Sequence, residues 1–222
     1  MPRPSPAETR ERLLRAAAAE IRLHGYAGAS LSSIAARLGM TKGSLAYHFP
    51  SKRDVALALF TSMEHTHGEL RTGVADDGLR GIRALLTLLA RTTSRGRTDP
   101  VFTAGTSLIV MSGALPFEVP RVFDDLITAY AASLDEARID GEIASDTDVG
   151  QAAEDILASM IGSWIVRART PDRPDTPPLR LAHAVLHSIG VADSEDVLRD
   201  LTDRGLAPWL EAGEHLRAQT TP

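Results

Sequence analysis

Apolar residues recur along the chain at the three- and four-residue spacing of amphipathic helices, and no stretch shows the alternation typical of a β-strand. Capping residues, prolines and glycines mark where most of these helices begin and end. The predicted helices cover residues 6–24, 30–38, 41–48, a long segment that starts at 52, and then 77–93, 99–111, 120–139, 147–169, 177–190 and 194–204, with a weak one after Pro208. The pattern therefore predicts an all-α chain.

The first part of the chain has the closest spacing of helix signals. Ser5 and Glu8 form a predicted capping box, Gly25 is a predicted helix end, and Ser51 opens a second capping box that Asp54 completes. Three compact helices are therefore expected before the long one. We predict a helix-turn-helix domain over 1–52 and a second helical domain over 53–222, with flexible spans at 94–98 and 170–178.

Charge is divided unevenly along the chain. The 222 residues include 24 Lys and Arg against 29 Asp and Glu, a net charge of −5. Residues 1–55 hold nine of the basic residues and four of the acidic ones, a net +5, so the remainder carries −10. Both lysines, Lys42 and Lys52, lie in the basic part. This division favours a basic N-terminal part that meets a polyanion and an acidic remainder that does not.

Composition excludes several classes of protein. Cysteine is absent, which excludes disulfide-stapled folds, cysteine-ligated zinc, iron–sulfur clusters and thiol nucleophiles. Apolar residues make up 43%, enough for a sizeable core, and aromatic residues only 5%, which disfavours a large β-sandwich. No apolar run approaches the ~20 residues that a membrane helix needs, and the N-terminus lacks a signal peptide's apolar region. We therefore expect a cytoplasmic protein with no membrane partner and no cofactor.

The two short helices have the physical pattern of a helix-turn-helix. Ile34 and Ala35 give the first helix an inner face, Gly39 permits a left-handed turn, and Leu45 and Phe49 anchor the second helix. The outward face offers donors of moderate reach for base edges and phosphates in a major groove. The residues expected to meet DNA are Ser30, Thr41, Lys42, Gly43, Ser44, Tyr47, His48 and Lys52, of which Lys52 is expected to direct its charge at phosphate.

This segment resembles the DNA-binding part of TetR-family transcriptional regulators. The matching residues are Gly25-Tyr26, Leu31, Ile34-Ala35, Gly39, Thr41-Lys42-Gly43, Leu45, His48-Phe49 and Ser51-Lys52. The resemblance implies an N-terminal helix-turn-helix domain, a C-terminal helical domain for ligand binding and dimerisation, and a homodimer on a palindromic operator of double-stranded DNA. Ala46 stands where the family usually has a tyrosine that contacts phosphate, and this departure bears on operator affinity, not on the fold.

A second resemblance, to the γ-butyrolactone autoregulator receptors within that family, extends further along the chain. It rests on Asp99-Pro100-Val101, on 116–120 and on Gly141-Glu142. In those receptors a tryptophan lines the ligand cavity, and the hydroxyl of a late Gly-Thr pair reaches the ligand. Their counterparts are Phe123 and Gly162-Ser163. The resemblance therefore implies a repressor released by a small apolar effector such as a butyrolactone-type signal.

A sensor pocket needs apolar walls and a few polar groups that orient the ligand. The candidates on the later helices are Phe102, Thr106, Met111, Phe123, Ile127, Met160, Ser163 and Trp164. Each aliphatic or Met side chain could equally belong to the core, and Trp164 to a subunit interface. Ala158 and Gly162 form a small-residue patch where a second helix could approach closely, which favours a homodimer built from two helices of each subunit.

No constellation of residues points to catalysis or to a metal site. His183 and His187 have a spacing compatible with zinc, but no third ligand lies nearby in the sequence. Motifs of hydrolases, zinc proteases and nucleotide-binding loops are absent. We predict a ligand-responsive regulator, a repressor and not an enzyme. The alternatives are a regulator that activates or whose ligand sensing is lost or altered, a helical small-molecule enzyme built around Ser159 or Ser163, and a structural DNA-packaging protein.

Overall fold

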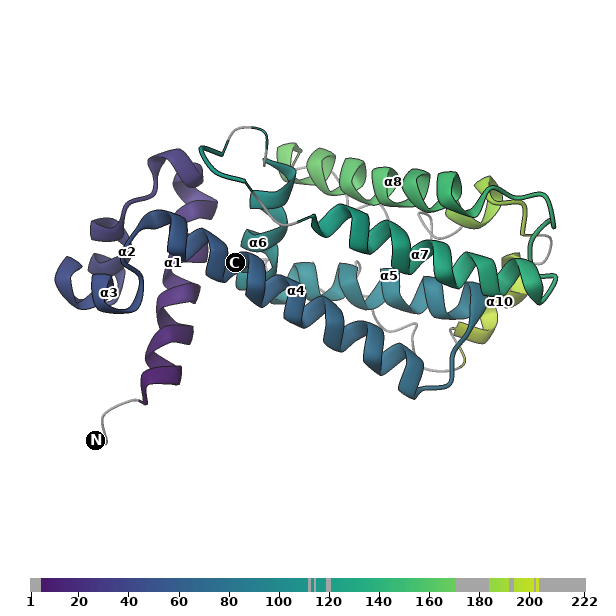
Figure 1. Ribbon diagram of the computed structural model, residues 1–222, viewed down its shortest axis with the longest axis horizontal. Coiled ribbons are helices and arrows are strands. Elements are labelled where there is room, and N and C mark those ends of the chain that lie inside the picture. Colours follow the sequence, from purple (N-terminus) through teal and green to yellow (C-terminus); the bar gives the residue numbers. More distant parts are fainter. Residues whose placement is uncertain are drawn as a thin grey trace, which may run out of the picture. The chain divides into compact units, whose positions relative to one another are not determined.

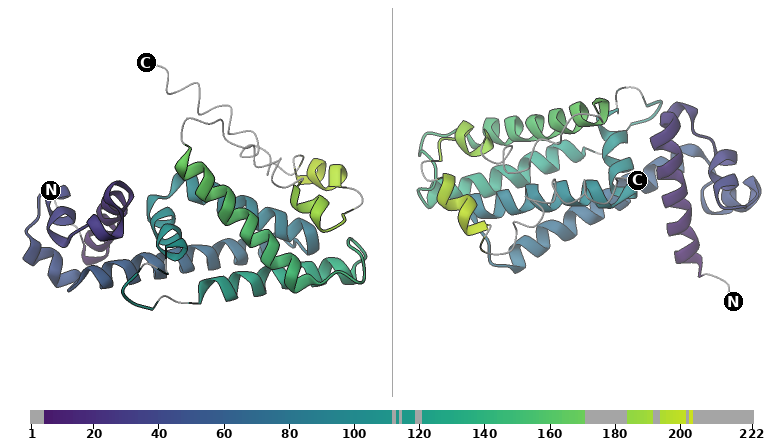
Figure 2. Two further views of the ribbon diagram at one scale, coloured as in Figure 1. Left: turned by 90° about the horizontal axis from the view of Figure 1, so that it is seen from above. Right: turned by 180° about the vertical axis from the view of Figure 1, so that it is seen from behind.

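The computed structural model describes residues 5–111, 113, 115–118, 121–170, 184–191, 194–201 and 203. Within these ranges the regular secondary structure is helical, which confirms the predicted all-α class. The helices are α1 (Pro6–Gly28), α2 (Leu31–Arg37), α3 (Lys42–His48), α4 (Lys52–Asp76), α5 (Gly81–Thr98), α6 (Pro100–Val110), α7 (Val122–Ile139), α8 (Val149–Arg169) and α10 (Ser194–Leu201) (Figure 1). Figure 2 shows them from two further directions.

The chain divides into two compact units, each of which draws on two stretches of sequence. Unit 1 consists of Met1–Glu69 and Arg95–Pro120, and unit 2 of Leu70–Ser94 and Arg121–Pro222. Helices α4 and α5 each run from one unit into the other. Unit 1 contains more than the predicted domain of residues 1–52, because α6 packs against α1 within it. The boundary after residue 52 remains a prediction about where the DNA-binding function ends.

Helix α1 begins as the sequence predicts, and at its predicted end, Gly25, the backbone leaves the helical conformation before a further short helical stretch. The N–H of Glu8 donates to Ser5 Oγ (3.2 Å) and the N–H of Ser5 donates to Glu8 Oε2 (2.6 Å), which completes the capping box. Gly25, the predicted end, has a φ of +67° and kinks the helix, and helical residues continue to Gly28. The N–H of Ala29 donates to the Gly25 carbonyl (3.1 Å), so the chain closes one more turn after the kink.

A partly buried ion pair holds α2 against α1. Arg37 Nε donates to Glu20 Oε2 at 2.5 Å, and Glu20 is only 5% exposed. His24 lies one turn further along α1, with its Nε2 3.6 Å from Glu20 Oε1. The hydrogen bond from Arg37 lowers the pKa of Glu20 below its ordinary value of 4.5 and outweighs the opposite effect of burial. The pair therefore stays ionised at neutral pH.

Helix α6 is firmly capped and crosses α4 closely. Two N–H groups of its first turn donate to Asp99 Oδ1, at 2.9 and 3.2 Å. At Gly105, an added Cβ would lie 2.7 Å from the Met63 Cβ and 2.8 Å from the Leu59 carbonyl oxygen. Atoms in a packed interior do not approach this closely, so the separation of the two helices requires glycine at this position.

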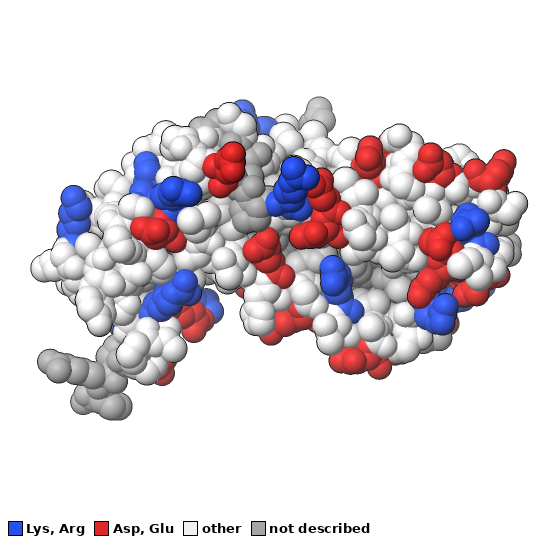
Figure 3. Space-filling model, in the orientation of Figure 1, with Lys and Arg blue, Asp and Glu red and all other residues white. Residues whose placement is uncertain are grey.

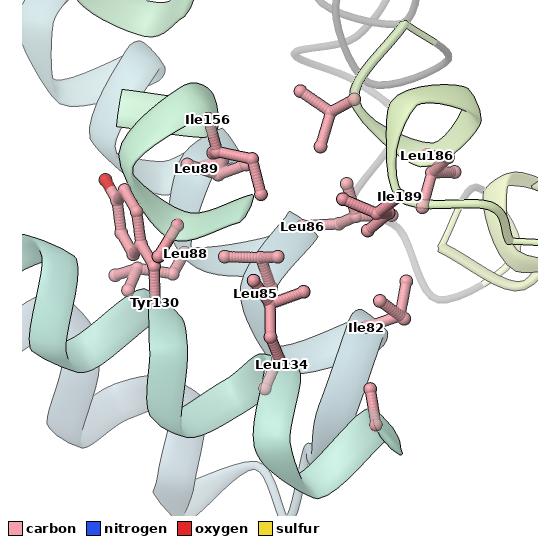
Figure 4. Close-up of a cluster of buried hydrophobic side chains, with 14 of the residues drawn as sticks. Ile82, Leu85, Leu86, Leu88, Leu89, Tyr130, Leu134, Ile156, Leu186 and Ile189 are labelled. Carbon is pink, nitrogen blue, oxygen red and sulfur yellow. The ribbon is translucent and has the colours of Figure 1, made fainter. Parts of the chain in front are cut away.

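The core of unit 2 lies between α5, α7, α8 and the helical residues 184–188 (Figure 4). Its largest fully buried side chains are Ile82, Leu85, Tyr130, Leu134, Ile156 and Leu186. Two carboxylates cap the start of α5: the N–H of Gly81 donates to Glu136 Oε2 (3.2 Å) and the N–H of Ile82 donates to Glu142 Oε2 (3.0 Å). Negative charge is stabilising at a helix N-terminus, so these contacts tie α5 to α7 and to the turn that follows it.

The structure corrects the prediction for the segment between α5 and α6. Residues 94–98, predicted to be flexible, are helical and end α5, which starts at Gly81 and not at 77. The N–H of Asp99 donates to the Arg95 carbonyl (2.9 Å), so α5 runs directly into the residue that caps α6. Outside the described residues lie the predicted helix after Pro208, most of 170–178 and the first part of 177–190.

Replacing Gly105 by alanine should destabilise the protein, because the added methyl group meets backbone and side-chain atoms of α4. We expect the free energy of unfolding to fall by about 1–3 kcal/mol in urea titrations. Gly68→Ala is the matched control: its Cβ would meet nothing within 4 Å, so alanine's higher helix propensity should raise stability by about 0.5–1 kcal/mol. Equal effects of the two substitutions would contradict the close crossing.

The Glu20–Arg37 pair should make the free energy of unfolding depend on pH in the acidic range. Because the pKa of Glu20 is lowered on folding, its stabilising contribution is complete above 4.5 and is lost as the pH falls through the lower, folded value. The difference in unfolding free energy between the wild type and Glu20→Gln should therefore shrink from about pH 7 to about pH 3. Glu11→Gln, which alters an exposed pair with Arg15, is the control for general acid effects. A difference that stays constant with pH would contradict this contribution.

Candidate nucleic-acid interface

The starts of α2 and α3 are capped by hydroxyl side chains, and a glycine turn joins the two helices. The N–H of Ser33 donates to Ser30 Oγ (3.0 Å) at the start of α2, and the N–H of Ser44 donates to Thr41 Oγ1 (3.1 Å) at the start of α3. Between them Gly39 has a φ of +64°, the left-handed conformation that the sequence predicts for this turn. These contacts give both short helices defined beginnings, as expected for a helix-turn-helix.

Buried apolar side chains hold α3 in place from its inner side. Leu45 is fully buried and Phe49 nearly so, and both pack in unit 1 as the sequence predicts, together with Ile34 and Ala35 of α2. The Arg10 guanidinium of α1 lies 5.2 Å from the centroid of the Phe49 ring. With one face anchored in this way, α3 has its opposite face in solvent.

The solvent face of α3 carries most of the predicted DNA-contacting residues. Those that the structure places in solvent on α3 and its cap are Thr41, Lys42, Gly43, Ser44 and Tyr47. Tyr47 is 87% exposed, and its ring meets the ring of the half-buried His48 edge-on, with centroids 5.4 Å apart. Ser30 is also exposed, but its hydroxyl is engaged with Ser33 at the start of α2. The start and the exposed part of α3 therefore offer one ammonium, two hydroxyls and one phenol to solvent.

Charge on the visible surface follows the division seen in the sequence. On the face shown in Figure 3, basic and acidic side chains both occur on the part built by α1, α2 and α3, whereas acidic side chains predominate over the part built by α7 and α8. A polyanion is therefore attracted to the first part more than to the second.

The Lys52 ammonium is hydrogen-bonded within the protein itself. Its Nζ donates to the carbonyls of Tyr26 (2.8 Å), Ala27 (3.1 Å) and Ala29 (3.0 Å), and lies 4.5 Å from the centroid of the Tyr26 ring. An ammonium has three N–H donors, and all three are used here. Lys52 therefore joins the start of α4 to the last turn of α1 and to Ala29, and its contact with phosphate stays a prediction.

The predicted effector-binding residues are divided between the two units. In unit 1, Phe102 is buried, Thr106 Oγ1 donates to the Phe102 carbonyl (3.0 Å), and Met111 is 47% exposed. In unit 2, the half-buried residues Phe123, Ile127 and Met160 pack against the core, and Ser163 and Trp164 are half-buried on α8. Each group is arranged in its own unit as partly buried apolar surface with a few hydroxyls, and the pocket itself remains a prediction.

A model of the family described as "Bacterial regulatory proteins, tetR family" matches residues 13–59. This range contains the anchored α3, its caps and the turn before it. Over these residues the chain matches the N-terminal domain of the TetR family of bacterial regulatory proteins. The match ends within α4, so it covers the helix-turn-helix and not the later helices.

Several known proteins resemble a larger part of the chain. The A-factor receptor protein of Streptomyces griseus is 28% identical over 174 residues, which are 76% of this chain and 58% of that protein. A crystal structure of a γ-butyrolactone receptor, an ArpA-like protein, is 28% identical with a TM-score of 0.75 and covers 93% of this chain and 98% of that one. CprB of Streptomyces coelicolor, a TetR family protein, is 27% identical with a TM-score of 0.71, over 96% and 99% of the two chains. These relatives are described as regulators or receptors, not as enzymes.

Some features of this TetR-family site have no counterpart in the sequence predictions. The sequence singles out the segment 116–120 without assigning a role to Phe117, and treats Arg53 only as part of a capping box. In the structure these two side chains are in contact, with the guanidinium 5.6 Å from the ring centroid. This contact could not be predicted from the sequence, because the two residues are 64 positions apart and no local pattern links residues at that distance.

Two features are absent from the described residues: a metal-binding cluster and a membrane-spanning helix. In this part of the chain, no three His, Asp or Glu side chains gather closely enough to hold a metal ion. Each described helix is too short or too polar to span a bilayer. His183 lies outside the described residues, so the predicted spacing with His187 is not seen as a pair.

Replacing Lys52 by methionine should lower stability, because three carbonyls that accept from one ammonium lose their donor. We expect the free energy of unfolding to fall by about 1–3 kcal/mol in urea titrations. Lys42→Met is the matched control, because Lys42 is exposed, and its effect should stay within about 0.5 kcal/mol. If both substitutions prove neutral, Lys52 does not brace the helix-turn-helix.

Proposed function

We propose that this chain is a DNA-binding transcriptional repressor that binds a palindromic operator as a homodimer and is released by a small apolar effector. The observation that carries this proposal is the solvent face of α3, where Lys42, Ser44 and Tyr47 are exposed on a helix whose other face is anchored by Leu45 and Phe49. An exposed row of donors on a rigid helix is the arrangement that reads base edges in a major groove.

The chemistry of α3 suggests a division of roles among its side chains. Lys42 can donate to guanine O6 and N7 or to phosphate, and Ser44 can bond to either kind of group. Tyr47 offers a ring for thymine methyl or sugar contact and a hydroxyl for phosphate. At the position where the family usually has a tyrosine, Ala46 offers only a half-buried methyl group, so Lys42 and Tyr47 are expected to supply more of the affinity here.

One face of α8 is suited to a second copy of the chain. Ala158 and Gly162 are exposed and small, and one turn further along Ile165 and Val166 are 38% and 55% exposed. Small residues let helix backbones approach closely, and the exposed apolar side chains gain from being covered. A dimer would also increase sequence specificity. The seven-residue α3 contacts few base pairs, whereas two copies contact two half-sites about 34 Å apart.

The proposed effector is a compact, mainly apolar molecule with one or two hydrogen-bond acceptors. This rests on Phe123 and Met160 against the unit 2 core, on the Ser163 hydroxyl, and on the description of similar proteins as an A-factor receptor and γ-butyrolactone receptors. An effector that prefers a conformation with weaker operator binding by about 1–3 kcal/mol would lower the affinity for DNA about 5- to 150-fold.

The alternative functions are less well supported. A regulator with lost or altered effector sensing would keep the α3 surface, and only effector binding distinguishes it. An enzyme would need an acid, base or nucleophile arranged around Ser159 or Ser163, and the Ser159 side chain is exposed. We propose no catalytic role, and we place the protein in the cytoplasm because operator binding requires access to the chromosome.

Selection of duplexes from a random pool tests DNA binding directly. The wild type should enrich a palindrome, and Lys42→Ala should bind that palindrome about 5- to 150-fold more weakly, with a relaxed base preference in each half-site. If Lys42 also contacts a phosphate, the slope of log affinity against log salt should fall by about 1. Arg121→Ala removes a 90% exposed cation of unit 2 and is the matched control. Failure of the wild type to enrich any duplex at low salt would overturn the proposal.

The same duplex provides the test of dimerisation and of effector release. Sedimentation should show two chains per palindrome, and a synthetic γ-butyrolactone with an alkyl side chain should dissociate the complex. A monomer that binds single half-sites would contradict the dimer. Retained binding with every lactone and furan offered would favour the regulator with altered sensing.

A further inference from the structure

Phe117 contacts the helix-turn-helix from a segment far away in the sequence. The segment 115–118 follows α6, is not helical, and belongs to unit 1. The half-buried Phe117 ring meets the Tyr26 ring of α1 edge-on, with centroids 5.7 Å apart and an angle of 70° between the planes. The Arg53 guanidinium of α4 lies 5.6 Å from the Phe117 centroid. One side chain therefore contacts both α1 and α4.

Lys52 extends this contact to a group of four side chains. It lies 4.5 Å from the Tyr26 centroid and is the neighbour of Arg53 in the first turn of α4. We name Tyr26, Lys52, Arg53 and Phe117 the aromatic clamp. Two cations here lie against two aromatic rings that also contact each other, and each kind of contact is stabilising.

The aromatic clamp joins the two ends of the helix-turn-helix. Tyr26 lies five residues before the start of α2, and Lys52 lies four residues after the end of α3. The short connection between α3 and α4 leaves α3 little freedom to move independently of Lys52 and Arg53. The position of α3 relative to α1 thus depends on whether the clamp is closed.

We propose that Phe117 is a positioning residue for DNA binding: it closes the aromatic clamp and so holds α3 in the orientation that binds the operator. The proposal rests on the proposed function, and it adds a residue that lies outside the range 13–59 matched by the family model. Phe117 itself offers no hydrogen-bond donor for bases or phosphates, so its effect on DNA binding is exerted through Tyr26 and Arg53.

The place of Phe117 in the chain gives the clamp a further consequence. The segment that carries it connects α6, which bears the predicted effector residues Phe102 and Thr106, to α7, which bears Phe123. A shift of either helix on effector binding would act on Phe117 through the backbone. Opening of the aromatic clamp is therefore the step by which we expect an effector to weaken operator binding.

The test compares Phe117→Ala, Phe117→Leu and Phe117→Tyr with the wild type. Leucine keeps the apolar bulk but removes the ring, whereas tyrosine keeps the ring and serves as the matched control. On the selected palindrome, the alanine and leucine variants should bind about five- to tenfold more weakly, and the tyrosine variant within about twofold of the wild type. The slope of log affinity against log salt should be unchanged in all three, because no phosphate contact is removed.

Amide hydrogen exchange tests, in the absence of DNA, whether Phe117 keeps the aromatic clamp closed. In the alanine and leucine variants, the amides of 26–30 and 52–56 should exchange faster, while those of 82–89 in unit 2 should not change. Wild-type exchange and affinity in Phe117→Leu would overturn the proposal, and so would a lower salt slope, which would indicate a direct DNA contact. If the wild type binds no duplex, the proposed function fails, whereas the exchange result still decides whether Phe117 closes the clamp.

Discussion

The ammonium of Lys52 is the constraint on which the helix-turn-helix depends. It comes from the first turn of α4 and bonds to three carbonyls that lie before α2, so it closes the chain around both short helices. Two seven-residue helices have little stability of their own, because each forms few internal hydrogen bonds for the residues it orders. Their stability comes from such ties, from the buried side chain of Leu45 and from the ion pair of Arg37 with the buried Glu20.

The positively charged side chains of unit 1 serve two different purposes. Lys52, Arg53, Arg10 and Arg37 are directed at carbonyls, aromatic rings or a carboxylate of the protein itself, and they give unit 1 its shape. Lys42 stands in solvent at the start of α3. Net charge brings a basic surface toward DNA, but recognition requires donors at defined positions. The structural cations provide those positions, and the side chains of α3 provide the chemistry.

Two helices connect the two units covalently. Helices α4 and α5 each contribute residues to both units, and α6 packs in unit 1 although it follows α5 in the chain. The close crossing at Gly105 and the contact of Phe117 with Tyr26 and Arg53 bring two segments of the later sequence against the first helices. A ligand can change the affinity for DNA only if it binds two conformations of the protein differently. These contacts are places where the two conformations would differ.

The helical pattern, the capping boxes at Ser5 and Ser51, the turn glycine Gly39 and the residues of α3 could all be predicted from the sequence, because helix periodicity and capping act between residues three or four positions apart. Tertiary structure alone decided what Lys52 bonds to, that 94–98 continues α5, and that Phe117 meets Tyr26 and Arg53. A lysine at a helix start has the same local sequence whether its ammonium faces phosphate or protein. Only the path of the chain brings three carbonyls within its reach, and that path is set by packing over distances that no local pattern records.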